Sequence, residues 1–287
     1  MPHWRNYLEH RYGSHHTVVG DLRIREKVWS PQLMNHRDIL VHLPPSYRFT
    51  QRHYPVIYMH DGQNLFDQAT SFSGEWHVDE TMVRLSAEGI EAIVVGIPNM
   101  GGQRLAEYGP FADPYHGPGR GDRYVSFLVD TVKPMIDHDF RTLPGREFTG
   151  ILGSSMGGLI SLFAFFQPPY AFGLVGVMSP STWFADAAIY DFVREAPLVP
   201  GKIYLDVGTR EYGGKTAADA QKRSRRYYAT VRHLQRLLIR KGYRPVHDLR
   251  YVEEKWASHH EPAWARRLPD ALRFLLQGLA ENVGVPS

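Results

Sequence analysis

Residues 148–166, FTGILGSSMGGLISLFAFF, carry the most informative pattern of this chain. Phe148–Leu152 is a short apolar run of the kind that forms a buried strand, and the apolar run Ser155–Phe166 is typical of a helix that stops before Pro168-Pro169. Between the two runs, Gly153-Ser154-Ser155-Met156-Gly157 matches G-x-S-x-G. A strand, a sharp turn and a helix are the setting in which this pattern presents a nucleophilic serine. The stretch therefore predicts an α/β fold with Ser155 at the tip of a turn.

The glycines of this motif are expected to make room for the turn. Side chains at Gly153 and Gly157 would collide with the neighbouring strand and helix. The N-terminus of the helix behind Ser155 also favours negative charge nearby. The alternative interpretation is an ordinary Gly/Ser turn that only starts a helix. Ser154 is the competing serine, but no G-x-S-x-G register centres on it.

Strands alternate with helices along the rest of the chain, which predicts a mostly parallel central sheet covered by helices on both faces. Leu22–Val28 and Asp38–Leu43 alternate apolar with polar residues, so they are expected as antiparallel strands at the N-terminal edge. The expected parallel strands are Pro55–Met59, Ala92–Ile97, Phe148–Leu152, Leu174–Met178, Ile203–Val207 and Leu249–Val252. The expected helices are Trp76–Ala87, Arg123–Asp139, Ser155–Phe166, Ala217–Lys241 and Ala263–Leu279. Segments 30–37, 99–122 and 179–185 are expected as loops.

The composition is that of an ordinary soluble protein: 287 residues, 43% of them hydrophobic and 22% charged. We expect one domain over residues 1–287, with 1–16 as a loosely attached extension. The 33 basic and 30 acidic residues leave little field to attract nucleic acid. The chain has no apolar stretch near the ~20 residues that span a membrane, and its N-terminus lacks the apolar core of a signal peptide. We therefore expect a cytoplasmic protein without nucleic-acid or membrane partners.

The absence of cysteine excludes disulfides, thiolate metal sites and a cysteine nucleophile. A serine needs a base, and in α/β hydrolases the triad runs Ser, acid, His along the chain. Of the 15 histidines, only His259 and His260 lie between the last expected strand and the last expected helix. We favour His259 on position, with His260 as the alternative. No metal-ligand spacing is recognised in the sequence, so no metal or cofactor is expected.

The acid is expected after the strand Ile203–Val207, and Glu211 lies there. Its carboxylate would accept the imidazole N–H of the base and stabilise the imidazolium. The alternative interpretation is a surface charge paired with Arg210. Asp206 is a rival inside the strand. Further candidates follow the strand Leu174–Met178, namely Asp186 and Asp191.

Two backbone N–H groups are expected to form an oxyanion hole. One belongs to Met156, the residue after the nucleophile. The other is expected from the loop after Pro55–Met59, where Gly62 lets the backbone come close and Gln63 supplies the N–H. An ordinary Asp61-Gly62 turn is the alternative.

The long segment 99–122 holds many glycines and prolines and follows an expected strand at the carboxyl edge of the sheet, where open α/β sheets bind ligands. We expect it to border the active site and to place Tyr108, Phe111 and Tyr115 against a substrate, unless these aromatic side chains only hold the segment to its own domain. The side chains expected to bind the substrate are Trp76, Tyr108 and Trp183.

These motifs together resemble the Putative esterase family of α/β hydrolases, which includes esterase D, feruloyl-esterase-like and enterochelin-esterase-related proteins. The resemblance covers most of residues 20–280. It rests on Tyr58–Asp67, Val95–Asn99 with Arg104 and Glu107-Tyr108, Gly153–Gly158, Gly208–Glu211, and His259-His260-Glu261 followed by Trp264. It implies the α/β-hydrolase fold and a triad of Ser155, Glu211 and His259. The chain departs from the family in having Glu as the acid and Trp256-Ala257-Ser258, where glycines are common, before the histidine.

The motifs and the resemblance favour a serine hydrolase that cleaves carboxylic esters through an acyl-enzyme. The resemblance alone suggests acylated sugars or aromatic esters as substrates. An acyltransferase that uses the same triad is the second hypothesis, and a non-catalytic binding protein of this fold is the third. The intact Ser155, Glu211 and His259 argue against the third hypothesis.

Overall fold

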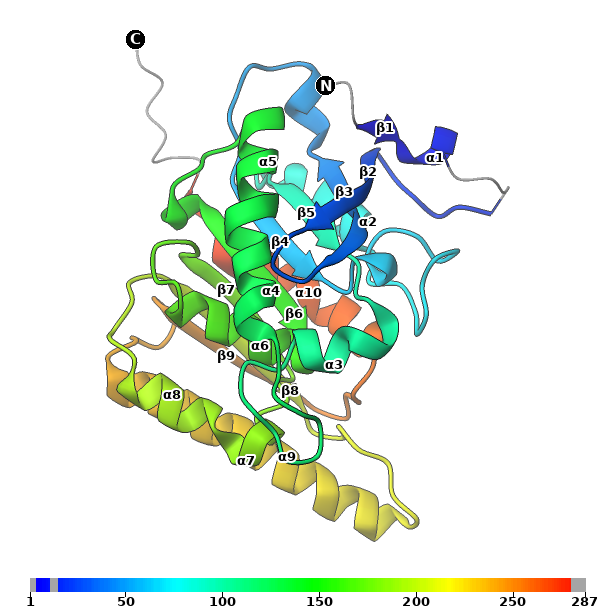
Figure 1. Ribbon diagram of the computed structural model, residues 1–287. Coiled ribbons are helices and arrows are strands. Elements are labelled where there is room, and N and C mark those ends of the chain that lie inside the picture. Colours follow the sequence, from blue (N-terminus) through cyan, green and yellow to red (C-terminus); the bar gives the residue numbers. More distant parts are fainter. Residues whose placement is uncertain (1–3, 11–14, 280–287) are drawn as a thin grey trace.

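The computed structural model describes residues 4–10 and 15–279, and within them the centre of the molecule is a mixed sheet of nine strands (Figure 1). The strand order is β1-β2-β3-β5-β4-β6-β7-β8-β9. The strands are β1 (Arg5–Asn6), β2 (Asp21–Ser30), β3 (Asn35–Leu43), β4 (Val56–His60), β5 (Ile93–Ile97), β6 (Thr149–Ser154), β7 (Leu174–Met178), β8 (Lys202–Gly208) and β9 (Leu249–Glu254).

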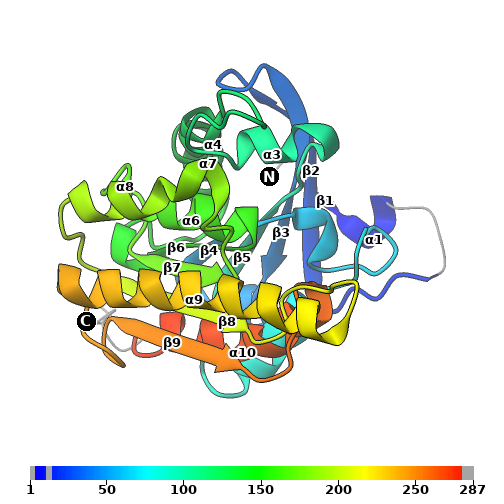
Figure 2. The same cartoon turned by 90° about the horizontal axis from the view of Figure 1, so that it is seen from below.

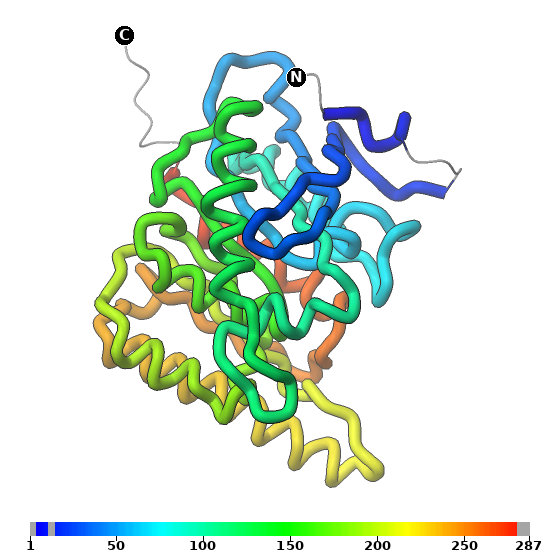
Figure 3. The backbone as a smooth tube through the Cα atoms, in the orientation of Figure 1, coloured from blue at the N-terminus to red at the C-terminus, as the bar shows by residue number. Residues whose placement is uncertain are grey.

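The sheet has an antiparallel edge and a parallel centre, as the hydrophobic pattern predicts. Strands β1, β2, β3 and β5 pair antiparallel to one another in that order. From β5 through β4, β6, β7 and β8 to β9 every pairing is parallel. All residues of β4, β5, β6 and β7 are buried, as strands covered on both faces must be. Figure 3 traces the chain in the orientation of Figure 1, from the blue β2–β3 hairpin to orange β9.

Helices cover both faces of the sheet and form two separate apolar cores. Helices α4, α5, α6, α8 and α9 pack on one face, and α2 and α10 pack on the other. Figure 2 shows the long α9 lying along β8 and β9. The α-helices are α1 (Tyr7–His10), α2 (Val78–Ser86), α3 (Arg104–Glu107), α4 (Gly121–Phe127), α5 (Lys133–Asp139), α6 (Met156–Phe166), α7 (Phe184–Ala187), α8 (Ile189–Glu195), α9 (Ala217–Lys241) and α10 (Glu261–Leu276).

Short helical turns complete the fold, namely η1 (Pro45–Arg48), η2 (Gly62–Asn64), η3 (Gly101–Gln103), η5 (Arg146–Phe148) and the π-helical turn η4 (Leu128–Val132), which joins α4 to α5. None of the helices in the described part of the chain has the length and apolar character that a membrane crossing needs.

Two expectations about loops and termini are wrong. Segment 99–122 is not a loop throughout, because η3, α3 and the start of α4 lie in it. Residues 4–10 are not loosely attached, because β1 pairs with β2 and both Trp4 and Tyr7 are buried. Residues 1–3 and 11–14 of the expected extension lie outside the described residues.

Helices α7 and α8 have no counterpart in the sequence-based prediction. Within α7, Ala185 and Asp186 both have φ of 50°, so this turn has no helical periodicity to recognise. Helix α8 spans seven residues, which is too short for a reliable pattern.

Candidate active site

Ser155 forms the tip of the turn between β6 and α6, in a strained backbone conformation. Its φ of 57° and ψ of −119° are unusual for a residue with a side chain. Three backbone hydrogen bonds hold it there. The N–H of Ser155 donates to Met178 at 2.9 Å, and its carbonyl accepts from the N–H groups of Ser181 at 3.0 Å and Leu159 at 3.1 Å. The surrounding backbone therefore maintains a conformation that an isolated turn would avoid.

The glycines around Ser155 differ in how much room they have. A Cβ on Gly153 would lie 2.6 Å from the His60 ring, as the steric argument predicts. The same argument is wrong for Gly157, where a Cβ would meet its nearest neighbour, the Cβ of His60, at an ordinary 3.4 Å. The tighter position is Gly158, where a Cβ would lie 3.0 Å from the carbonyl oxygen of Met178. The second glycine at which a side chain would be crowded is therefore Gly158, one residue after the expected Gly157.

The structure brings Ser155, His259 and Glu211 into one chain of hydrogen bonds. The Oγ of Ser155 lies 2.9 Å from Nε2 of His259, and Nδ1 of His259 lies 2.6 Å from Oε2 of Glu211. The three side chains come from the segments that follow β6, β9 and β8. His260 turns away, because its Nε2 lies 2.7 Å from the hydroxyl of Ser258 at the exposed start of α10. Of the two adjacent histidines, His259 alone contacts Ser155.

Aromatic rings surround the imidazole of His259. Tyr212 stacks on it with ring planes 8° apart, while Tyr227 and Trp264 meet it edge-on at centroid distances of 5.5 and 5.0 Å. The loop before it carries an exposed Trp256 with φ of 67°, a left-handed position that favours glycine. The ring of Trp256 packs under the guanidinium of Arg210 at 4.2 Å. Arg210 therefore pairs with this ring, and Glu211 is not a surface charge.

Glu211 is buried, and its two oxygens have different partners. Oε1 accepts hydrogen bonds from the hydroxyl of Ser179 at 2.8 Å and from the N–H of Gly208. Oε2 faces the imidazole N–H. The carboxylate is thereby held in one orientation by neutral donors.

The rival acids have other partners. Asp206 lies in β8, where its Oδ1 accepts the N–H of Ser179 at 3.0 Å and its Oδ2 pairs with Nε of Arg267 at 2.9 Å. Burial raises the pKa of Asp206 to about 6, although Arg267 opposes this shift. Asp186 is exposed on α7, and Asp191 is exposed on α8, where it pairs with Arg194.

The two residues expected to supply oxyanion donors flank the same cleft. Met156 is the first residue of α6, and the N–H groups of a helix's first turn have no acceptor within the helix. Gln63 lines the cleft within η2, where its carbonyl accepts the hydroxyl of Thr70 at 2.9 Å and its Oε1 accepts the N–H of Asn99 at 3.1 Å. A Cβ on Gly62 would lie 2.7 Å from the backbone of Pro98, so this turn packs directly on the end of β5.

An ion pair between Asp61 and Arg104, whose side chains are 12% and 29% exposed, supports this turn. Asp61 has φ of 55° and accepts two hydrogen bonds from Arg104, at 2.7 and 2.8 Å, and one from the amide of Asn99 at 2.6 Å. Burial alone would raise the pKa of Asp61, but Arg104 and Asn99 together hold it below its usual value. Asp61 is therefore a charged anchor directly before Gly62.

A cleft of about 820 Å³ opens beside Ser155 at the carboxyl edge of the sheet. Its walls combine aromatic, amide and hydroxyl groups with a few charges. The lining residues are Asp61, Gln63, Asn64, Thr70, Phe72, Ser73, Trp76, Asn99, Gly101, Gly102, Arg104, Ser154, Ser155, His259, Glu261 and Trp264. The segment 61–76 supplies much of this lining, including Thr70, Phe72 and Ser73, which have no part in the sequence-based prediction of the site.

The three expected substrate contacts have different outcomes. Trp76 lines the cleft but is only 3% exposed, so its role stays a prediction. The expectation for Tyr108 is wrong, because its side chain is fully buried and its hydroxyl accepts the N–H of Asp61 at 3.2 Å. Trp183 is half-exposed but lies outside the cleft lining, against His116 and Phe184, so its role stays a prediction.

Segment 99–122 borders the cleft only through its first residues, Asn99 to Arg104. Phe111 instead packs edge-on against the rings of Phe163 and Phe192. Tyr115 is 90% exposed and is not among the residues of the cleft. Most of the segment's aromatic side chains therefore hold it to the protein or face solvent.

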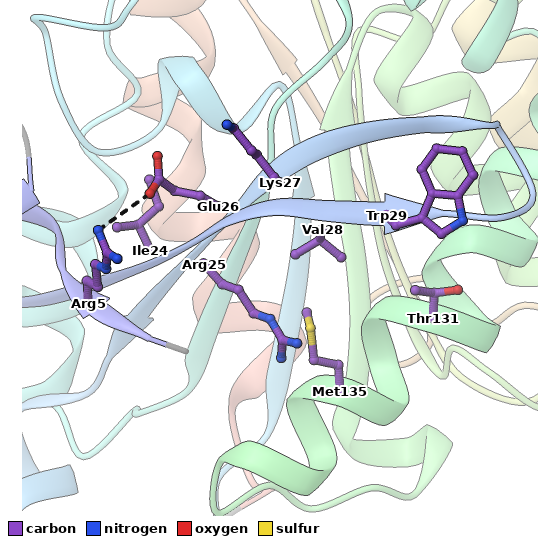
Figure 4. Close-up of a pocket in the computed structure, with 9 residues that line it drawn as sticks. All are labelled: Arg5, Ile24, Arg25, Glu26, Lys27, Val28, Trp29, Thr131 and Met135. Carbon is purple, nitrogen blue, oxygen red and sulfur yellow. Dashed lines mark ion pairs between the residues drawn. The ribbon is translucent and has the colours of Figure 1, made fainter. Parts of the chain in front are cut away.

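A second hollow, of about 620 Å³, lies beside the bulged strand β2 and far from Ser155 in the sheet order (Figure 4). Trp29 and the helix residues Thr131 and Met135 form one end, and the ion pair of Arg5 with Glu26 lies at the other. None of the predicted site residues lines this hollow.

One described group of side chains has the composition of a metal site. Glu75, His77 and Glu80 each place a potential ligand atom within 4.8 Å of the others. The group lies at the N-terminus of α2, where the helix dipole disfavours a cation, and His77 is exposed. The spacing Glu75-x-His77-x-x-Glu80 is present in the sequence, where no metal site is expected. The expectation that the protein needs no metal stays a prediction.

Comparisons with known proteins agree on one family and one fold. The model of the family described as Putative esterase matches residues 30–275. An uncharacterized protein, YbbA of Bacillus subtilis (strain 168), is 27% identical over 247 residues, which are 83% of this chain and 92% of YbbA. The siderophore enterobactin esterase of Emericella nidulans is 29% identical over 159 residues, which are 48% of this chain and 50% of that protein.

Solved structures share the fold at low sequence identity. The siderophore hydrolase EstA from Aspergillus nidulans superposes with a TM-score of 0.69 at 20% identity, over 91% of this chain and 99% of that one. The BES protein from Bacillus cereus also gives a TM-score of 0.69, at 19% identity over 92% of this chain and 98% of that one. This similarity shows that the chain has the fold of these α/β hydrolases.

Proposed function

Because this chain belongs to the Putative esterase family it is a carboxylic-ester hydrolase, and we propose that it acts through an acyl-enzyme formed on Ser155. The observation that carries the mechanism is the run of contacts from the Ser155 hydroxyl through His259 to Glu211, at 2.9 and 2.6 Å. These are hydrogen-bond distances between a nucleophile, its base and the group that orients the base.

In the first half-reaction, Oγ of Ser155 attacks the ester carbonyl carbon while Nε2 of His259 takes its proton. The N–H groups of Met156 and Gln63 donate to the carbonyl oxygen as it becomes negative. His259 then gives the proton to the leaving alcohol oxygen as the ester C–O bond breaks. The acyl group is left on Ser155.

In the second half-reaction, water attacks the acyl carbon and His259 takes its proton. The carbonyl re-forms, the bond to Oγ breaks, and Ser155 recovers the proton as the carboxylic acid leaves. Glu211 accepts the imidazole N–H and stabilises the imidazolium of His259 in both halves. An alcohol in place of this water would make the same site an acyltransferase.

The cleft supports a small-molecule ester with a ring and several polar groups, such as an acylated sugar or an aromatic ester. The exposed ring of Phe72 and the largely buried rings of Trp76 and Trp264 give the cleft an aromatic lining, and Asn64, Asn99 and Thr70 make it partly polar. Because one related protein is named a siderophore enterobactin esterase and a structural neighbour is named a siderophore hydrolase, a siderophore ester belongs in any substrate panel. A cytoplasmic location and a single domain over residues 1–287 stay predictions.

The test is a panel of esters assayed with the full chain and with Ser155→Ala. The panel contains p-nitrophenyl acetate and butyrate, methyl ferulate, an acetylated glucose and enterobactin, each with and without added ethanol as acyl acceptor. Ser155→Ala is expected to lose on the order of 10⁴-fold or more in rate while keeping its circular dichroism spectrum. Full activity in that variant would refute the mechanism, and ethyl ester as the main product would assign acyl transfer instead.

A further inference from the structure

Ser179 lies directly after β7. Its hydroxyl hydrogen-bonds both to the candidate acid, Glu211, and to buried side chains of α10. Its hydroxyl donates to Oε1 of Glu211 at 2.8 Å. The same oxygen accepts hydrogen bonds from Nε1 of Trp264 at 3.2 Å and from Nη2 of Arg267 at 3.0 Å. Indole and guanidinium N–H groups donate and never accept. Both lone pairs of the hydroxyl are therefore occupied, and its single proton can only point at Glu211.

The guanidinium that fixes Ser179 is itself buried and held by carboxylates. The side chain of Arg267, on α10, is 4% exposed. Its Nε pairs with Asp206 at 2.9 Å and its Nη1 with Glu254 at 3.5 Å. A charged group so deeply buried is stable only where such partners surround it.

The partners of Arg267 mark the carboxyl ends of three adjacent strands. Ser179 follows β7, Asp206 lies in β8, and Glu254 is the last residue of β9. The segments that carry Glu211 and His259 begin at the ends of β8 and β9. One guanidinium thus ties together the strand ends from which the acid and the base project.

We propose that Ser179 is a positioning residue for Glu211, and that Arg267 and Trp264 act through it by fixing the direction of its O–H bond. This inference rests on the proposed role of Glu211 as the acid of the triad. With Ser179 and Gly208 both donating to Oε1, only Oε2 is left for His259, so the carboxylate cannot rotate. The role of Ser179 is to hold the acceptor of the His259 N–H in place.

Ser30 provides a matched comparison for the loss of a buried hydroxyl. It is fully buried like Ser179, and its hydroxyl bonds only locally, accepting the N–H of Leu33 at 3.1 Å and contacting the side chain of Gln32 at 3.4 Å. Ser30 lies in β2, near the edge of the sheet that is far from β7 and β8. Its replacement by alanine tests stability alone.

The experiment is a double-mutant cycle of Ser179→Ala and Glu211→Ala in the full chain, with p-nitrophenyl acetate as substrate and Ser30→Ala as control. Ser179→Ala is expected to lower kcat roughly tenfold to hundredfold, the range for losing a hydrogen bond to a charged group, with KM changed by less than about threefold. In the Glu211→Ala background the same substitution is expected to have almost no further effect, because the group it positions is gone. Ser30→Ala is expected to keep kcat.

The outcomes separate this inference from the proposed function. Equal losses from Ser179→Ala in both backgrounds, or no loss in either, would overturn the positioning role while leaving the triad intact. Full activity in Glu211→Ala would instead refute the acid of the proposed mechanism. If Ser179→Ala does not fold, Ser179→Cys keeps the volume with a weaker donor, and the same dependence on Glu211 is expected of its smaller loss.

Discussion

The cleft beside Ser155 and the hollow beside β2 have comparable volumes, about 820 and about 620 Å³, but their charged side chains are held very differently. In the cleft, Arg104 donates two hydrogen bonds to Asp61, whose side chain is 12% exposed. In the hollow, Arg5 and Glu26 approach no closer than 3.8 Å, and the arginine is 70% exposed. Surface pairs of that kind contribute little.

The two regions also differ in where they lie in the sheet. The cleft opens at the carboxyl ends of parallel strands, where segments from β4, β5, β6 and β9 converge. The hollow lies on an antiparallel strand near the edge, where neighbouring residues come mostly from β2 itself. Two features distinguish the candidate active site more than its volume does. Separate segments of the chain converge there, and the strained backbone of Ser155 is held in place by its surroundings.

The largest expected effect lies within the cleft and separates two adjacent histidines. His259→Ala is expected to lose on the order of 10⁴-fold or more in kcat/KM, because Ser155 then has no base. His260→Ala is expected to stay within about threefold of the parent, because that side chain bonds Ser258 instead. Kinetics of p-nitrophenyl acetate hydrolysis measure both. Inactivity of the His260 variant with activity in the His259 variant would shift the assignment by one residue.

A smaller effect is expected at the ion pair beneath the candidate oxyanion donor. Arg104→Ala leaves Asp61 as an unpaired buried carboxylate directly before Gly62 and Gln63, so kcat is expected to fall roughly tenfold to hundredfold. Arg25→Ala, in the hollow beside β2, breaks a pair with Asp139 at 3.2 Å that is similarly exposed but does not line the cleft, and it is expected to leave kcat unchanged. Equal losses in the two variants would mean that Arg104 has no special part in the site.

Exposed aromatic rings in the cleft and in the hollow beside β2 give the next comparison. Phe72 lines the cleft and is 91% exposed, whereas Trp29 lines the hollow beside β2 and is 42% exposed. Phe72→Ala is expected to change the preference between p-nitrophenyl butyrate and acetate by roughly tenfold, as the loss of an apolar pocket wall does. Trp29→Ala is expected to leave the preference as it is. The ratio of the two kcat/KM values measures this, and an unchanged ratio in Phe72→Ala would remove Phe72 from the substrate site.

No effect is expected from metal removal. Each step of the proposed mechanism uses protein groups and water, so dialysis against EDTA should leave the esterase rate unchanged. Because Glu75, His77 and Glu80 lie close together next to Trp76, the assay also tests whether they matter. Loss of activity in EDTA that zinc or calcium restores would refute this prediction.

Much of the fold and of the candidate triad could be predicted because their signals are local. Strand β7 and helix α9 begin and end at the predicted residues, since each has a clear apolar period bounded by Gly, Pro or polar residues. Ser155 stands in a compact motif. Glu211 and His259 follow from chain order once that motif is recognised, although order alone left His260 open.

The supporting side chains could not be predicted because their partners are remote in the chain. Asp61 and Arg104 are 43 residues apart, and Ser179 and Arg267 are 88 apart, so no local pattern links either pair. Tyr108 was assigned to the substrate for its aromatic ring, but composition cannot tell which way a ring faces. The Gly157 argument failed for the same reason, since only coordinates show that Gly158 makes the closer approach.

The central claim is that Ser155 is the nucleophile, and covalent labelling tests it most directly. The full chain is treated with a p-nitrophenyl alkylphosphonate, which serine esterases attack, and the adduct is located by peptide mass mapping. We expect one phosphonyl group per chain, on the peptide that carries Ser155. Esterase activity should fall in proportion to the fraction of chains labelled, and Ser155→Ala should not be labelled. A stoichiometric adduct on another residue, or an active enzyme that the phosphonate never labels, would contradict the account.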